Sequence, residues 1–232
     1  MNLFTKAKIF YHIKKHILFN KGYVNWLNDY LAEKKMYHYL MDNQLLFVHI
    51  PKCGGNSFVH SLGFDEGIGH LGVTDFVLTI PHEKFKSLYK FTIIRNPWDR
   101  LVSAYFFLKQ GGWGEGDAQW FNQNLSQYED FESFVMEWLS PKNAILHGHF
   151  TPQYKYLTID NNCLLIDKFY KLESLTELDN DLEGYLKNPM SSTVRNASDR
   201  KPDYRTYFTN DMIQKVHCIY QRDINLFNYN YE

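Results

Sequence analysis

The stretch QLLFVHIPKCGGNSF, residues 44–58, constrains the fold of this chain more than any other segment. It opens with the continuous apolar run QLLFVHI (44–50), which is typical of a strand buried in a parallel sheet and which ends at Pro51. Gly54 and Gly55 then provide a turn, and residues 56–62 have helical character. A strand that enters a helix through a glycine turn indicates an α/β protein.

The rest of the chain continues this alternation. Further elements are predicted as a helical stretch at 22–40, a buried strand at 90–94, a helix from Pro97 to Gly111-Gly112, an apolar run from 163, a helix at 174–187 and a long terminal helix capped by Thr209. We therefore expect an α/β fold with a parallel sheet flanked by helices. Residues 1–44 are expected to form an N-terminal helical extension packed on one domain, residues 45–232.

Charge and cysteine content narrow the possible partners. The 25 lysines and arginines nearly balance the 26 aspartates and glutamates, so no global field favours nucleic acid, and any anion site must be local. Three scattered cysteines indicate a reducing compartment and imply no metal, so we expect a cytoplasmic protein. Residues 1–20 form a basic amphipathic segment, for which packing on the domain is preferred and contact with a membrane surface is left open.

Two strand-to-helix turns carry residues that suit phosphate. At the first, Gly54 and Gly55 allow a close backbone approach to an anion and Lys52 adds a full charge. The lysine precedes the glycines, unlike the Walker pattern, which disfavours a magnesium-dependent ATP or GTP enzyme. At the second, Arg95 ends the strand at 90–94, and Ser103 follows about two helical turns later. Either turn alone would also fit an ordinary loop with a solvated cation.

Taken together, the two turns resemble a known family. HIPKCGGNS looks like the 5′-phosphosulfate loop of sulfotransferases and RNPWDRLVSAY like their 3′-phosphate segment, most similar to the Golgi-type carbohydrate sulfotransferases and their bacterial relatives. HFTPQ (149–153), DKFYKLESL (167–175) and YQRDINLFNY (220–229) resemble later segments of that group. The resemblance implies the P-loop-like nucleotide-binding sulfotransferase fold and the sulfuryl donor 3′-phosphoadenosine 5′-phosphosulfate (PAPS).

The resemblance also implies which residues bind the donor. The 5′-phosphosulfate would be held by Lys52, Cys53, Gly54, Gly55, Asn56 and Ser57, and the 3′-phosphate by Arg95 and Ser103. Cys53 and Asn56 depart from the threonine that is frequent at their positions, but a backbone N–H and an amide donor remain. Transfer would be an in-line displacement in which Lys52 stabilises the leaving phosphate, and the chemistry requires no metal.

The acceptor hydroxyl must lose a proton to a nearby base. In the resembled enzymes a histidine between the two binding turns faces the acceptor, so His70 is the first candidate for the catalytic base. His147 and His149 are the second candidates. Their spacing would also suit metal ligands, but with no third ligand apparent a structural or acceptor-side role is preferred. His49 is expected to be a core residue.

The acceptor and the late loop are less constrained. Trp113 and Trp120 lie in the stretch most suited to a sugar, whereas Trp98 and Trp138 are expected to pack. In the basic loop 196–205, Arg200 and Lys201 are candidate nucleotide contacts beside Arg205. The expected partners are a nucleotide donor and a glycan or other hydroxyl acceptor, with the oligomeric state open. A nucleotide kinase with an atypical phosphate loop and a non-catalytic nucleotide- or sulfated-glycan-binding module remain as alternatives.

Overall fold

The computed structural model describes residues 20–160, 162–192 and 200–231. Within these residues, contacts divide the chain into two units, each assembled from separate segments: 20–50, 54–93 and 153–192 form the first, and 51–53, 94–152 and 200–231 form the second. This division differs from the boundary expected at residue 44, which stays a prediction. The segment 1–19, including most of the basic amphipathic stretch, lies outside the described residues.

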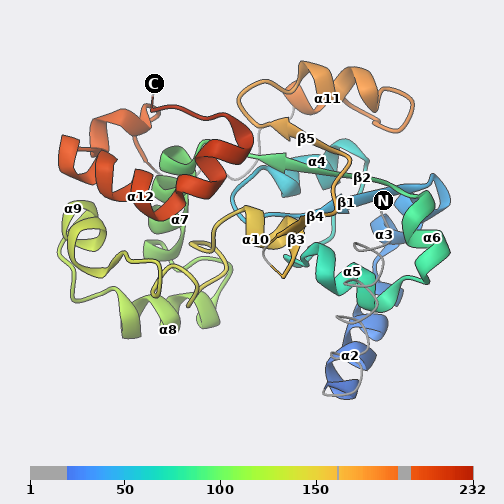
Figure 1. Cartoon of the computed structure of the whole chain (residues 1–232), viewed down its shortest axis with the longest axis horizontal. Coiled ribbons are helices and arrows are strands. Elements are labelled where there is room, and N and C mark those ends of the chain that lie inside the picture. Colours follow the sequence, from blue (N-terminus) through green and yellow to red (C-terminus); the bar gives the residue numbers. More distant parts are fainter. Residues whose placement is uncertain (1–19, 161, 193–199, 232) are drawn as a thin grey trace. The chain divides into compact units, whose positions relative to one another are not determined.

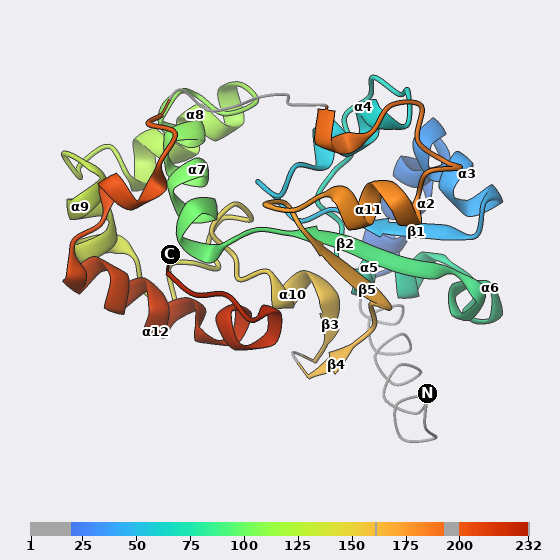
Figure 2. The same ribbon diagram turned by 90° about the horizontal axis from the view of Figure 1, so that it is seen from above.

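A three-stranded sheet organises the first unit (Figures 1 and 2). Its strand order is β1-β2-β5, and β1 and β2 run parallel with Leu45 opposite Tyr89 and Val48 opposite Thr92. The elements of this unit are α2 (Lys21–Ala32), α3 (Lys35–Asp42), β1 (Leu45–Val48), α4 (Gly55–Ser61), α5 (Val73–Thr79), α6 (His82–Ser87), β2 (Tyr89–Ile94), α10 (Tyr154–Leu157), β3 (Thr158–Ile159), β4 (Cys163–Leu164), β5 (Lys168–Lys171), α11 (Thr176–Asp181) and η2 (Met190–Ser192). The predicted α/β fold with a parallel sheet flanked by helices is confirmed.

Aromatic side chains from successive elements form the core against this sheet. The Phe47 ring on β1 lies 4.5 Å from Phe58 on α4 and 5.4 Å from Phe91 on β2, and Phe91 meets Tyr170 on β5 edge-on. Tilted and edge-to-face pairs of this kind add about 0.5–1.5 kcal/mol each beyond the area they bury. The alternating pattern of the sequence therefore produces one continuous packing layer from β5 to α4.

The structure differs from the sequence prediction at three places in this unit. The helix predicted at 174–187 is present only as α11, which ends at Asp181. The helical stretch predicted at 22–40 is two helices, α2 and α3, separated at Glu33-Lys34. The apolar run that begins at 163 provides the short strand β4, which pairs antiparallel with β3, and the third strand of the main sheet is β5. Short apolar runs do not reveal their strand partner, because pairing depends on residues far away in the sequence.

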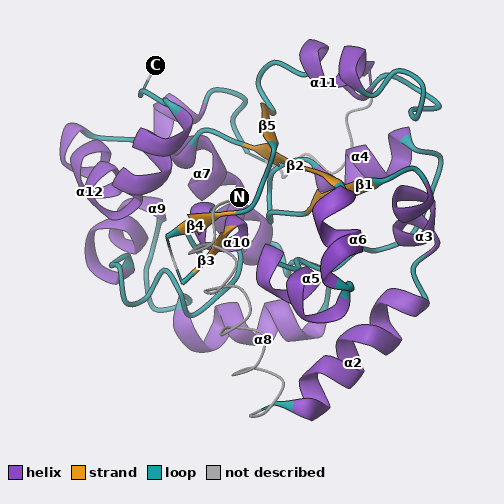
Figure 3. Ribbon diagram, turned by 45° about the vertical axis from the view of Figure 1, so that its right-hand side comes forward, coloured by secondary structure: helices purple, strands orange, loops and turns teal. Residues whose placement is uncertain are grey.

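Helix α7 (Pro97–Lys109) is the centre of the second unit. Asn96 caps it by accepting the Trp98 N–H at 3.0 Å, and Pro97 takes the first helical position, as predicted. The other elements are α8 (Glu115–Asn124), α9 (Phe131–Ser133), the π-helical turn η1 (Phe134–Trp138), η3 (Tyr204–Tyr207) and α12 (Asn210–Phe227), which begins at its predicted cap Thr209. Strands are short, and helices and loops make up most of the described chain (Figure 3).

The core of this unit joins α7 to α12 and η1. Trp98 and Trp138 are both buried, which agrees with the packing role expected for them. The Tyr220 hydroxyl on α12 donates to the Phe150 carbonyl at 2.7 Å, and this contact fixes the chain just after the HFTPQ segment begins. None of the helices in the described part of the chain combines the length and the apolar character that crossing a bilayer demands.

Candidate active site

The glycine turn after β1 packs closely against neighbouring side chains. Gly54 adopts a left-handed conformation (φ 79°) at the cap position of α4, and a Cβ there would lie 2.6 Å from Leu172. A Cβ on Gly55 would lie 1.9 Å from Nε2 of His49. A side chain would clash at either position, so the two glycines are explained by the fold before any ligand is considered. Asn56 and Ser57 follow in the first turn of α4, and Ser57 is buried.

His70 contacts a second histidine, His49, which packs against this turn. The ring centres of His49 and His70 are 4.4 Å apart, and His49 in turn occupies the space beside Gly55. His49 is buried, as a core residue should be, but its neighbours are the loop glycine and the predicted base. Sequence reasoning missed this arrangement because the strand position of His49 gives no sign of which loop residue will pack on it.

Lys52 belongs to the second unit, together with Pro51 and Cys53. Its backbone is left-handed (φ 66°), which costs a residue with a side chain about 1–2 kcal/mol. Two hydrogen bonds hold that backbone: Arg95 Nη1 donates to the Lys52 carbonyl at 3.0 Å, and Arg100 Nε donates to the Pro51 carbonyl at 2.9 Å. The Lys52 ammonium lies 3.6 Å from the centre of the Phe107 ring.

The surroundings of Lys52 disfavour the charged form of its side chain. Burial lowers the pKa of its ammonium to about 7, and repulsion from Arg95 and then Arg200 contributes in the same direction. A nearby anion would favour the charged form and raise this pKa again. The site therefore has the electrostatic property expected of a place where negative charge binds.

Asp99 lies between two arginines of the same unit. Arg95 Nε is 2.8 Å from Asp99 Oδ2, and Arg200 Nη2 is 2.6 Å from Asp99 Oδ1. Arg100, which is 2% exposed, and Lys52 belong to the same unit, where Arg100 donates to the Pro51 carbonyl. Among the described residues, Arg100 Nη2 and Arg200 Nη1 are buried without a hydrogen-bond partner.

The structure separates the three basic residues of the late loop. Arg200 joins the cluster through Asp99, whereas Arg205 forms an exposed pair with Asp203 and Lys201 is exposed beside Tyr207. The sequence does not reveal that Arg100 contacts the loop backbone. Ser103 is buried on α7, 4% exposed.

A sequence profile described as the sulfotransferase family matches residues 36–230. The chain belongs to this family. The match covers both contact units and both turns, and it starts inside the predicted N-terminal extension. No curated protein sequence and no solved structure gave a match. Sulfuryl transfer in general is therefore supported by family membership, which leaves the acceptor and the donor to be argued from this chain.

The second pair of histidines lies in the same unit as Lys52. His147 Nδ1 is 3.1 Å from His149 Nδ1, and His147 Nε2 is 3.5 Å from Asp117 Oδ1 on α8. Burial lowers the pKa of His147, against the opposing effect of Asp117. His149 packs on Phe107, the ring that also contacts Lys52. Trp113 is 65% exposed, whereas Trp120 is half-buried and packs on His147, Trp138 and Phe150.

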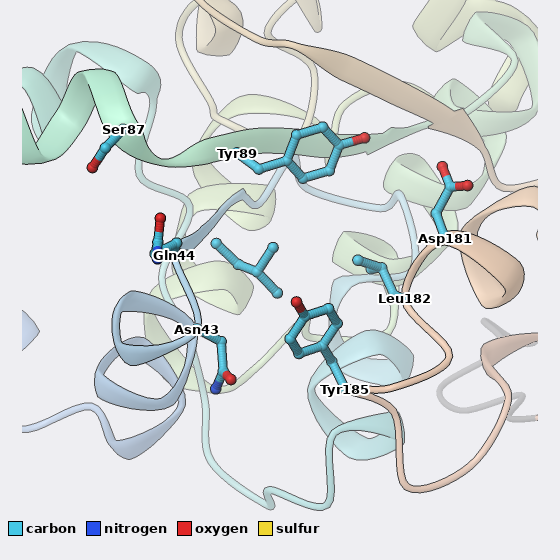
Figure 4. Close-up of a pocket in the computed structure, with 8 residues that line it drawn as sticks. Asn43, Gln44, Ser87, Tyr89, Asp181, Leu182 and Tyr185 are labelled. Carbon is cyan, nitrogen blue, oxygen red and sulfur yellow. The ribbon is translucent and has the colours of Figure 1, made fainter.

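A surface pocket in the first unit does not suit the sulfuryl donor. It has a volume of about 480 Å³ and is lined by residues that include Leu45 and Tyr89, the first residues of β1 and β2 (Figure 4). Family ligands are expected at the opposite, carboxyl ends of parallel strands. No lysine or arginine is among its lining residues, so nothing there would balance two phosphates.

Proposed function

We propose that this protein transfers the sulfuryl group of PAPS to a hydroxyl of a carbohydrate or a similar polar acceptor. The observation that carries the proposal is a group of basic residues in the second unit: Arg95 and Arg200 pair with Asp99, and Arg95 and Arg100 donate to the backbone carbonyls of Lys52 and Pro51. A buried N–H without a partner costs about 1–3 kcal/mol, more on a charged group, and a phosphate would supply the missing acceptors. Family membership supports the sulfuryl donor of a sulfotransferase as this anion.

Each residue has a distinct part in the proposed reaction. Lys52 donates to the bridging oxygen of the donor and stabilises the charge that grows on the leaving phosphate. Its neighbours along the chain, Cys53 to Ser57, offer backbone N–H groups and the Asn56 and Ser57 side chains to the 5′-phosphosulfate. Arg95 and Ser103 bind the 3′-phosphate, and Arg200 adds a second guanidinium to that charge.

His70 is the proposed base for the acceptor hydroxyl. Its contact with His49, which lies against Gly55, supports a place beside the loop that holds the sulfuryl group. A base near neutral pH removes the proton as the acceptor oxygen attacks the sulfur in line with the leaving phosphate. Trp113, exposed in the turn between α7 and α8, is the proposed stacking surface for a sugar ring.

The test is a transfer assay with ³⁵S-labelled PAPS and a panel of glycans, run in parallel with labelled ATP and Mg²⁺. We expect sulfate incorporation with at least one hydroxyl acceptor, and Lys52→Ala should abolish it. Incorporation of phosphate from ATP would instead establish a kinase. Tight binding of adenosine 3′,5′-bisphosphate without transfer to any acceptor would establish a binding module.

A further inference from the structure

Asp117, His147 and His149 form a cluster that the proposed reaction does not use. Asp117 comes from α8, and the two histidines come from the loop that follows η1. One donor atom from each residue lies within 4.8 Å of the donor atoms of the other two. The third ligand that the sequence does not reveal next to His147 and His149 is therefore a carboxylate thirty positions upstream.

The spacing of the two imidazoles fits a metal ion. A zinc ion binds histidine nitrogens at about 2.0–2.1 Å, so two ligands of one tetrahedral ion lie roughly 3.3 Å apart. His147 Nδ1 and His149 Nδ1 are 3.1 Å apart, with their rings stacked at 24°. The Asp117 carboxylate lies 3.5 Å from Nε2 of His147, on the other side of that ring from Nδ1, so the His147 ring or the Asp117 side chain must turn for all three to bind one ion.

The surroundings fix the carboxylate and shield the imidazoles. Asp117 Oδ2 accepts the Trp113 N–H at 2.9 Å, which leaves Oδ1 facing the histidines. Gly112 is left-handed, and a Cβ on it would lie 2.2 Å from Asp117 Oδ2, so the turn before α8 is shaped around this side chain. Outer contacts of this kind orient metal ligands. His149 is 6% exposed, and Trp120 covers the His147 ring at 4.4 Å.

We propose that Asp117, His147 and His149 bind one divalent first-row transition-metal ion, with a fourth coordination position open to water. Two imidazoles and one carboxylate suit Zn²⁺, Ni²⁺, Co²⁺ or Cu²⁺ and disfavour Mg²⁺ and Ca²⁺, which select oxygen ligands. The ion joins α8 to the His147–His149 loop. Because its binding does not involve the donor, this site holds whether or not the protein transfers sulfate.

The experiment uses the full chain without a histidine tag, treated with a chelator and dialysed. Zn²⁺, Co²⁺ and Mg²⁺ are titrated separately, and bound metal is counted by elemental analysis. We expect one equivalent of Zn²⁺ or Co²⁺, no Mg²⁺, and quenching of tryptophan fluorescence by Co²⁺ because Trp120 adjoins His147. A Trp120→Phe variant should bind Co²⁺ with most of the quenching lost.

Ligand substitutions decide whether the metal is at this cluster. His147→Ala, His149→Ala and Asp117→Asn should each weaken Zn²⁺ binding by at least about tenfold. His217→Ala, on α12 of the same unit, is the matched control and should bind as the wild type does. If both histidine variants bound Zn²⁺ as tightly as the wild-type protein, or if the wild-type protein bound no stoichiometric Zn²⁺, the proposal would be overturned. The three residues would then form only a hydrogen-bonded Asp117–His147–His149 chain.

A second measurement covers the case in which a variant does not fold. Co²⁺ bound to the wild-type protein should broaden the NMR signals of the His147, His149 and Trp120 rings, because a paramagnetic ion acts over short distances. Broadening at other histidines with these three unaffected would place the ion elsewhere and refute the assignment. Neither readout requires sulfotransfer, so a failure here is distinguishable from a failure of the proposed function.

Discussion

The charge state of Lys52 makes donor binding depend on pH in a specific direction. In the free protein the pKa of Lys52 is about 7, because burial and then the repulsion from Arg95 and Arg200 disfavour its charged form. A bound phosphate raises that pKa again. The affinity for a bisphosphate nucleotide is therefore highest below pH 7. It falls as the pH rises above 7, until the pH reaches the pKa of Lys52 in the complex.

The size of the effect follows from proton linkage. One pKa unit corresponds to 1.36 kcal/mol, or tenfold in affinity. If the bound phosphate returns Lys52 close to its ordinary pKa, affinity falls about fiftyfold between pH 7 and pH 9, and binding at pH 8 takes up about 0.9 proton. The phosphates add little to this change, because with a second pKa of about 6 they are already about 90% doubly ionised at pH 7.

Isothermal titration calorimetry with adenosine 3′,5′-bisphosphate measures both quantities. Titrations at pH 7, 8 and 9 give the affinity, and buffers with different heats of ionisation give the proton uptake. Lys52→Arg keeps its charge throughout, so its affinity should stay constant across this range. Lys142→Met removes an exposed lysine of the same unit and should keep the wild-type dependence. Less than a threefold change in the wild-type protein, with no proton uptake, would refute the reasoning.

Three further predictions concern single residues. Arg95→Met should weaken bisphosphate binding by about ten- to a hundredfold and Ser103→Ala by about three- to tenfold, because a charged hydrogen bond is worth more than a neutral one; equal losses in calorimetry would contradict the assigned roles. His70→Ala should lower kcat by at least about a hundredfold with nucleotide affinity kept, and an unchanged rate would exclude it as the base. Gly55→Ala should destabilise the protein by about 1–3 kcal/mol, since its Cβ would meet His49, whereas Gly184→Ala has open space and should leave Tm within a degree in calorimetric scans.

The sequence predicts the elements of the site better than its contacts. The strand run 44–50, the glycine turn and the cap-and-proline start of α7 are local signals, and the structure has an element at each. Lys52 and Arg95 follow from those signals because each occupies a fixed place beside a turn. Asp99 and Arg200 meet at 2.6 Å across about a hundred residues, and no local pattern predicts that distance.

The histidines also show that local sequence patterns do not predict long-range contacts. His147 and His149 are recognisable as a pair because two-residue spacing brings them to one turn. Asp117 completes the cluster only because the turn at Gly112 directs α8 back towards them. His49 resembles any other residue of a buried strand, and its position beside Gly55 and His70 depends on how α4 and the following loop pack.

Arg95 and Arg100 explain how Lys52 can keep a strained backbone conformation at the proposed donor site. A left-handed lysine would relax to an ordinary conformation if its backbone were free, but Arg95 and Arg100 bind the carbonyls of Lys52 and Pro51. These contacts use one N–H of each guanidinium for the backbone, and they hold the positive charges together before any ligand arrives. The free energy needed to bring the like charges together is therefore supplied by folding. An incoming phosphate meets positive charges that are already in place, so little of its binding energy is lost to rearrangement.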